Sequence, residues 1–155
     1  YTTLFRSVLL PIISIVLVWL FSMKANEKMP SLYARLKLPF RLPNTFFRNG
    51  WIIMYILFAI AWGYAIYYEG NTAFLIGLLL LLLNLVWIWV FVSGEFVFAL
   101  FLLVLAIILI VAMLVLLWLL VATTPVLWIP IILFLIYLAW IGLATYQNAY
   151  VALYN

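Results

Sequence analysis

Apolar residues along this chain fall into five long runs separated by polar breaks. The runs lie near residues 4–23, 49–68, 72–92, 96–121 and 126–151. Each is close to or above the roughly 20 apolar residues that a helix needs to cross a bilayer. Three of the breaks are only a few residues long, and connections of that length favour antiparallel neighbours. The pattern predicts an all-α integral membrane protein, a single bundle of five transmembrane helices within residues 1–155.

The first break differs from the others because it is long and basic. Residues 24–48 hold six of the seven basic residues: Lys24, Lys28, Arg35, Lys37, Arg41 and Arg48. By the positive-inside rule, we expect this segment to be a loop on the cytoplasmic or equivalent side, with the C-terminus on the same side. Residues 31–37 could form a short helix that Pro39 ends. The basic residues either only orient the protein and contact anionic headgroups, or they also grip a ligand.

Composition narrows the chemistry that the chain can perform. Of its 155 residues, 73% are hydrophobic and only 6% are charged, whereas a soluble domain has about 25% charged residues. The absence of cysteine and histidine excludes disulfides, thiolate nucleophiles, imidazole bases and His/Cys metal sites. The three carboxylates, Glu27, Glu69 and Glu95, each stand where an apolar run breaks, so no acid pair is available for catalysis. We therefore expect neither an enzyme nor a metal site.

Two smaller expectations concern the beginning of the chain. The sequence opens at Tyr1 rather than Met, so we expect that it is processed or incomplete. A charged segment follows the first apolar run where a signal peptide would have a small-residue cleavage site, so we interpret that run as a retained span.

Two amides inside the apolar runs are the most informative polar residues. Asn84 and Asn148 lie in or near the hydrocarbon, where lipid cannot hydrogen-bond them, so both should face the bundle interior, a cavity or an interface. Helical spacing places Trp87 on the face of Asn84, and Trp140 and Ala144 on the face of Asn148. Such faces suit a pocket for a flat apolar ligand. Alternatively, the amides hydrogen-bond neighbouring helices and contribute about 0.6–2 kcal/mol each.

Small and aromatic residues add expectations about packing. Ala59, Gly63, Gly142, Ala144 and Ala149 are the small residues expected to allow close contacts of the second and fifth spans. The second span also carries an aromatic stripe at helical spacing: Trp51, Tyr55, Phe58 and Trp62. Such a stripe usually serves packing or lipid contact. Trp51 and Tyr55 are also candidates for the wall of a pocket, and we expect Trp62 to serve in packing or interfacial anchoring.

Three motifs occur in the order and spacing of a known family. They are WIIMY at residues 51–55, NLVWIWVF at residues 84–91 and YLAWIGLATYQN at residues 137–148. Over about residues 30–155 the chain resembles the translocator protein / tryptophan-rich sensory protein family (TspO/MBR), whose members have five helices and a long loop between the first two. Here the loop has no Trp, keeps separate prolines where the family usually has a Pro-Pro pair, and the C-terminus lacks the aromatic-then-basic pattern linked to cholesterol.

The resemblance implies a function and a set of site residues. It implies binding of a porphyrin or related tetrapyrrole, including a haem-like ligand, or of a sterol, for transport or sensing. The residues expected to surround one cavity and form the ligand site are Trp51, Tyr55, Asn84, Trp87, Trp140, Ala144 and Asn148. Those expected at its mouth, where they would meet porphyrin carboxylates, are Arg35, Lys37 and Arg41. No further cofactor is implied.

A second function class remains open at this stage. The chain could be a structural accessory subunit of a larger membrane complex that keeps the fold without the ligand, which the altered loop and the uniformly apolar residues 99–122 favour. A channel or transporter is disfavoured because no intramembrane charge marks an ion path. Expected partners are membrane lipids, a small-molecule ligand, and a second copy or complex subunits, with no nucleic acid. The expected location is a mitochondrial or other organelle membrane, or a bacterial inner membrane.

Overall fold

The computed structural model describes residues 2–155 and contains five long helices. They are α1 (Thr2–Arg35), α2 (Asn44–Glu69), α3 (Asn71–Val92), α4 (Phe96–Val121) and α5 (Trp128–Tyr154), with a 3-10 turn η1 (Pro125–Leu127) before α5. All five are long and apolar enough to cross a membrane. The predicted five-helix transmembrane bundle is confirmed.

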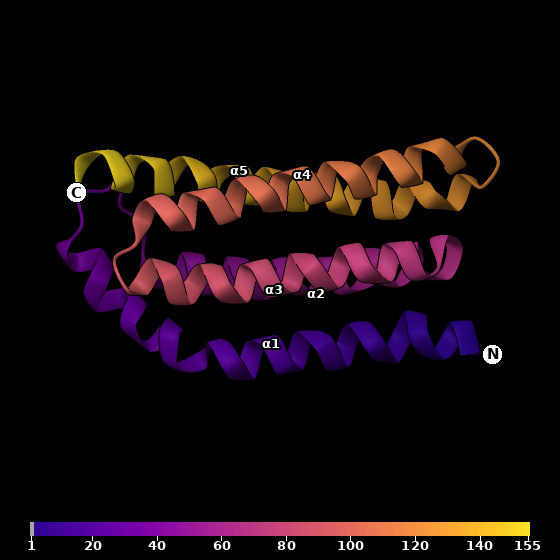
Figure 1. Ribbon diagram of the computed structural model, residues 1–155, viewed down its shortest axis with the longest axis horizontal. Helices are drawn as coiled ribbons and strands as arrows, with labels where there is room; N and C mark the ends of the chain where they lie inside the picture. The colour runs from indigo at the N-terminus through magenta and orange to yellow at the C-terminus, as the bar shows by residue number, and fades with distance from the viewer. Residues whose placement is uncertain (1) are drawn as a thin grey trace.

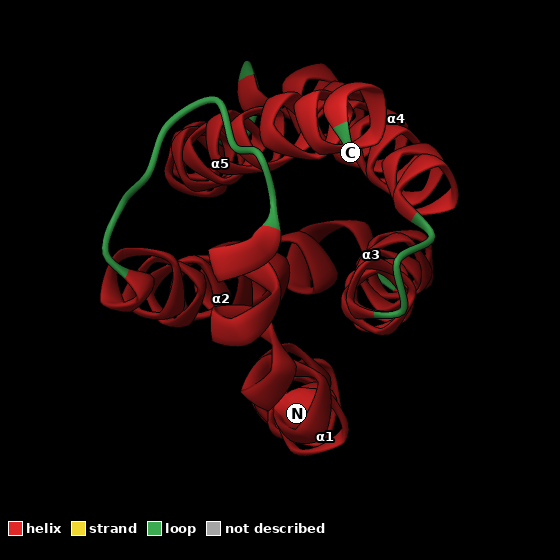
Figure 2. Cartoon of the chain, turned by 90° about the vertical axis from the view of Figure 1, so that its left-hand side faces the viewer, coloured by secondary structure: helices red, strands yellow, loops and turns green. Residues whose placement is uncertain are grey.

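The helices are arranged as a four-membered ring with one helix outside it. Contacts run from α2 to α3, from α3 to α4, from α4 to α5 and from α5 back to α2, while α1 packs against α2 and α3 (Figures 1 and 2). Because α1 contacts the ring along one stripe, it buries Val18 and Ala25 but leaves most of its large apolar side chains exposed. In a bilayer those side chains face lipid.

Two glycines make the short turns of the ring possible. Gly70, between α2 and α3, has φ 67°, and Gly94, between α3 and α4, has φ 91°. Both values lie in the left-handed region that residues with a Cβ rarely adopt. Gly70 also closes α2, since its N–H donates to the carbonyl of Ile66 at 2.9 Å. These turns reverse the chain within one to three residues and keep successive helices antiparallel.

The expected loop over residues 24–48 is wrong in extent. Helix α1 continues to Arg35 and α2 begins at Asn44, so the non-helical connection is only residues 36–43. The charged residues after position 23 mark where the apolar run ends, but they do not end the helix. Ala25 and Leu32 continue the buried stripe of α1 beyond that point, and Leu36 is buried directly after the helix ends. Of the short helix expected at residues 31–37, residues 31–35 form the last part of α1, whereas residues 36–37 belong to the connection.

Hydrogen bonds fix the 36–43 connection across one end of the bundle. Arg41 donates through Nη1 to the carbonyl of Tyr33 at 3.0 Å and through Nη2 to that of Leu36 at 2.7 Å, so it caps carbonyls at the end of α1. The N–H of Lys37 donates to Oδ1 of Asn155 at 2.8 Å, and Nδ2 of Asn155 donates to the carbonyl of Lys37 at 3.0 Å. The connection and the C-terminus therefore share one end of the bundle, seen from that end in Figure 2.

Of the expectations about small and aromatic residues, some are confirmed and one is wrong. Gly63 is confirmed as a close contact, because a Cβ there would stand 2.5 Å from the carbonyl oxygen of Ser7 on α1. The expectation for Gly142 is wrong: it is exposed, and a Cβ there would meet no described atom within 4 Å. Trp62 is completely buried, so it is a packing residue rather than an interfacial anchor. Its indole occupies the space that the missing side chain of Gly77 leaves.

Candidate functional site

An aromatic cluster joins three helices of the ring near the end that the 36–43 connection covers. The ring centroid of Trp51 on α2 lies 5.8 Å from that of Trp87 on α3 and 5.8 Å from that of Trp140 on α5. The Trp51 ring stands edge-on to Trp140 at 88° and also packs against Tyr55 at 5.9 Å. Four of the residues expected to bind a ligand thus lie together, at the distances of direct aromatic contact.

The two intramembrane amides are buried, as expected, and both have protein partners. Nδ2 of Asn84 donates to the hydroxyl of Tyr137. Oδ1 of Asn148 accepts from the indole N–H of Trp87 at 2.9 Å, while its Nδ2 donates to the carbonyl of Phe96 at 2.9 Å. These bonds tie α3, α4 and α5 together, as the packing alternative describes. Tyr137, completely buried beside Asn84, was not among the predicted site residues.

Two buried donors on α5 lack such partners. Nε1 of Trp140 and Nε2 of Gln147 make no hydrogen bond to any described residue. They lie seven residues apart and therefore share one face of the helix. Gln147 is only 5% exposed, and a buried amide without a partner costs about 1–3 kcal/mol. Gln147 was not among the predicted site residues, although an amide seven residues after Trp140 within an apolar run was a visible reason to include it.

The loop side of Trp140 is covered by the start of α2. Phe46 and Phe47 pack on the Trp140 ring at centroid distances of 6.1 and 6.2 Å. Gly50 lies directly against the same ring, so a Cβ at this position would overlap it. Ala144, one turn further along α5, is partly buried against the apolar core. On the side that faces α2, the Trp140 ring is therefore in direct contact with the rings of Phe46 and Phe47.

A small cavity lies immediately outside this cover. Its volume is about 230 Å³, and its lining includes Tyr33 and Pro30 of α1, Arg41 and Leu42 of the connection, and Phe47 of α2. Tyr33 and Phe47 are in ring contact at 5.9 Å and form the wall that faces the aromatic cluster. The cavity and the cluster thus meet at Phe47.

The three basic residues expected at the mouth are placed differently from one another. Arg41 lines the cavity while two of its donors cap α1. Arg35 bonds the carbonyl of Ser31, one turn earlier in the same helix, at 3.4 Å. Lys37 is exposed and is held through its backbone. Of these three basic residues, only Arg41 therefore lies beside the cavity. Separately, within residues 2–155 no group of His, Cys, Asp or Glu side chains could hold a metal ion.

Comparison with protein families identifies the family of this chain. The family model for the TspO/MBR family matches residues 7–154 of the 155-residue chain. The chain belongs to the TspO/MBR family. Searches of curated proteins and of solved structures found no match. Family membership agrees with the five-helix bundle and with a multi-pass integral membrane protein, and the family is generally non-enzymatic.

Proposed function

We propose that this TspO/MBR protein binds a flat, largely apolar ligand of the porphyrin or tetrapyrrole class between α2, α3 and α5, for transport or sensing. The observation that carries the proposal is the pair of buried donors without partners, Trp140 Nε1 and Gln147 Nε2, on the α5 face that carries the indole cluster. The indoles offer flat surfaces for stacking, and the two N–H groups offer hydrogen bonds to carboxylate or carbonyl oxygens of the ligand.

Ligand entry requires a local movement of the cover. The cavity at the mouth has about 230 Å³, below the roughly 300–1,000 Å³ of typical ligand pockets. A rotation of Phe47 away from Trp140 would join the cavity to the aromatic cluster and enlarge the site. Arg41 stands on the cavity rim, where its remaining N–H donors can pair with a ligand carboxylate. The proposal thus assigns Phe47 as the gate and Arg41 as the outer anchor.

Binding rather than catalysis fits the chemical groups that are present. The described residues around the cluster offer indoles, amides and phenols, and the full sequence has no histidine or cysteine. Such groups can stack and hydrogen-bond, but they do not supply the acid–base pair that hydrolytic chemistry requires. We therefore propose a non-catalytic role for the site.

The test is a titration of the purified protein with protoporphyrin, followed by quenching of tryptophan fluorescence. We expect saturable quenching with a micromolar Kd, equivalent to about 8 kcal/mol. Ala144→Phe should abolish binding by filling the site while leaving helical content intact. Gln147→Leu removes one donor at similar size and should weaken binding about fivefold, the effect of one net hydrogen bond.

A matched control separates the loss of a specific donor from the loss of any polar group on α5. Thr145→Val removes a hydroxyl that bonds the carbonyl of Ile141 at 2.7 Å, within α5 itself, and it should leave Kd unchanged. If protoporphyrin gives no saturable quenching, the structural-subunit alternative replaces this proposal. If the parent binds but Ala144→Phe and Gln147→Leu bind equally well, the ligand site lies elsewhere.

A further inference from the structure

The positive charge of the chain is concentrated at the end of the bundle that the connection and the C-terminus share. Six of the seven basic residues lie within residues 24–48, and the carboxylates at this end are Glu27 and Glu95. The seventh basic residue, Arg6, lies at the opposite end, where it donates to Oδ1 of Asn71 at 3.0 Å. The membrane surface around the connection is therefore positively charged, which favours anionic partners.

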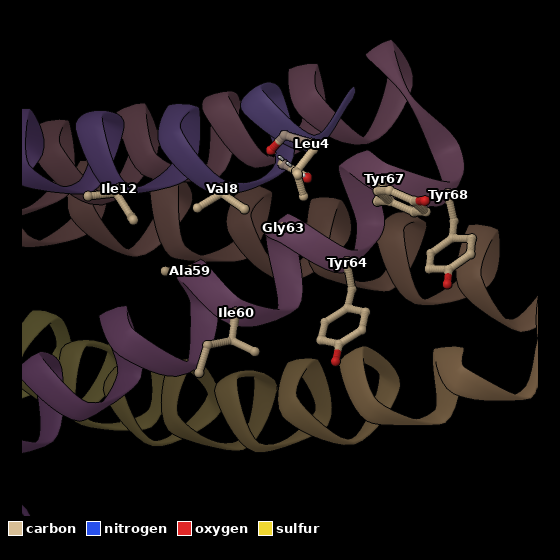
Figure 3. Close-up of a pocket in the computed structure, with 10 residues that line it drawn as sticks. Leu4, Val8, Ile12, Ala59, Ile60, Gly63, Tyr64, Tyr67 and Tyr68 are labelled. Atoms are coloured by element: carbon tan, nitrogen blue, oxygen red, sulfur yellow. Dashed lines mark hydrogen bonds between the residues drawn. The ribbon is translucent and has the colours of Figure 1, made fainter. Parts of the chain in front are cut away.

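The opposite end of the bundle offers lipid an uncharged surface instead. A groove of about 460 Å³ lies there between α1 and α2, and its described lining includes Tyr64, Tyr67 and Tyr68 but no charged residue (Figure 3). Because no charge lines this groove, it cannot attract an anionic headgroup more strongly than a zwitterionic one. The groove therefore serves as an internal reference for the basic end.

Two lysines at the basic end lie beside an exposed tryptophan. Lys24 and Lys28 are exposed and lie one helical turn apart on α1, about 40° apart around its axis. Nζ of Lys28 lies 5.8 Å from the ring centroid of Trp89 on α3, within the range of a cation–π contact. The indole N–H of Trp89 donates to the carbonyl of Phe21 on α1 at 3.1 Å. These contacts hold Lys28 at the seam between α1 and α3.

The lysines lie at the depth of lipid headgroups. The apolar run of α1, residues 4–23, is about 30 Å long at 1.5 Å per residue, which is the thickness of the hydrocarbon core. Lys24 follows this run directly, and Lys28 lies about 6 Å further along the helix, within the headgroup layer of roughly 5–7 Å. Trp89 is 39% exposed, and its place beside Lys28 agrees with this depth, because tryptophan concentrates at the membrane–water interface.

The nearest carboxylate along α1 does not separate the two lysines. Glu27 is exposed and lies about 60° from Lys24 around the helix axis, on the side away from Lys28. The two ammonium groups can therefore approach one anion together.

We propose that Lys24 and Lys28, beside Trp89, bind the phosphate of an anionic phospholipid such as phosphatidylglycerol in the adjoining leaflet. The phosphate oxygens accept charge-assisted hydrogen bonds from both ammonium groups. Phosphatidylcholine also carries a phosphate, but its choline is a cation that the lysines repel. The site contains none of the residues proposed to bind the tetrapyrrole, so it does not depend on that proposal.

The experiment uses two matched photoreactive probes on the full chain in phosphatidylcholine nanodiscs. The probes are a phosphatidylglycerol and a phosphatidylcholine with the same acyl chains and a diazirine at the same carbon beside the ester. We expect the phosphatidylglycerol probe to label the peptides around residues 21–30 and 85–92 about 25-fold more, fivefold for each lysine at an anionic surface. Residues 59–68 of the groove should be labelled equally. High salt should reduce the preference, because exposed charges are screened.

Substitutions of single lysines test the assignment. Lys24→Gln and Lys28→Gln should each lower the preference about fivefold, and Lys28→Arg, which keeps the charge, should retain it. The matched control is Lys37→Gln, which removes the same charge from an exposed residue of the connection and should leave the preference within about twofold of the parent. Circular dichroism of each variant should show parental helical content.

Four results would overturn the proposal. Equal labelling of the basic end by both probes would mean that no headgroup is selected. Equal losses in Lys28→Gln and Lys37→Gln would indicate the general field of the basic end rather than a site. Displacement of the phosphatidylglycerol probe by millimolar glycerol 3-phosphate would replace the lipid with a soluble phosphate. Displacement by hexaglutamate alone would replace it with an acidic protein segment.

Discussion

Adding one methyl group at Gly77 should destabilise the bundle, because the space beside this residue is already occupied. A Cβ on Gly77 would overlap the indole of Trp62 at Nε1, Cε2 and Cδ1. The indole cannot yield easily. It is completely buried, its Nε1 donates to the carbonyl of Ala73 at 2.9 Å, and its ring stacks on Phe74 at 5.8 Å and 9°. Gly77→Ala must therefore shift the tryptophan or separate α2 from α3.

The size of the effect follows from three contributions. Overpacking a well-packed interior costs about 1–3 kcal/mol, and a displaced indole N–H that loses its acceptor costs about 1–3 kcal/mol more. The replacement of glycine by alanine within a helix stabilises the helix by about 1 kcal/mol. The two costs exceed the gain, and we expect Gly77→Ala to lower the free energy of unfolding by about 2 kcal/mol. For a chain of this size that corresponds to a melting temperature about 4–8 °C lower.

Thermal unfolding in detergent, followed by intrinsic fluorescence or circular dichroism, measures this shift. The matched control is Gly142→Ala, the same substitution in a transmembrane helix where a Cβ meets no described atom within 4 Å. The control should retain the helix-propensity gain and melt at the parental temperature or slightly above. Equal melting temperatures for the two variants would refute the reasoning, because they would mean that Trp62 does not fill the space beside Gly77.

Three further predictions concern other contacts. Tyr137→Phe leaves the buried amide of Asn84 without its partner and should cost about 1–3 kcal/mol in thermal unfolding; no change in melting temperature would mean that water replaces the phenol. Asn148→Leu should cost a similar amount, because it leaves the Trp87 N–H unpaired; a variant as stable as the parent would contradict this bond. Asn155→Ala removes both hydrogen bonds to the Lys37 backbone and should speed proteolytic cleavage within residues 36–43; a parental rate would show that Arg41 alone holds the connection.

The number of spans was predictable because hydrocarbon thickness sets a length that the sequence must match. The apolar runs near 72–92 and 96–121 coincide closely with α3 and α4, since a short polar break ends each run. The end of α1 was not predictable in the same way. Charge marks the surface of the bilayer, whereas the helix continues for as long as residues such as Ala25 and Leu32 have a surface to pack on.

The candidate site was only partly visible in the sequence. Spacing along single helices placed Asn84 and Asn148 toward the interior, because an amide cannot face hydrocarbon. It did not show that Tyr137 would bond Asn84 or that Gln147 would remain without a partner. Those outcomes depend on how α3, α4 and α5 are rotated relative to one another. Likewise, the importance of Gly77 appears only once Trp62 is placed on the neighbouring helix.

The aromatic stripe of α2 serves two different parts of the molecule, and this separation can be tested. Trp51 belongs to the cluster at the loop end, beside the donors without partners, whereas Trp62 is locked against Gly77. Eleven helical residues separate the two, about 16 Å, and substitutions farther apart than about 7–10 Å usually act independently. Gly77→Ala should therefore lower the melting temperature without changing the Kd for protoporphyrin, and Gln147→Leu should weaken binding without lowering the melting temperature. A Gly77→Ala protein that loses binding in proportion to its stability would mean that the stripe acts as one unit and that the tetrapyrrole contacts the core of the ring.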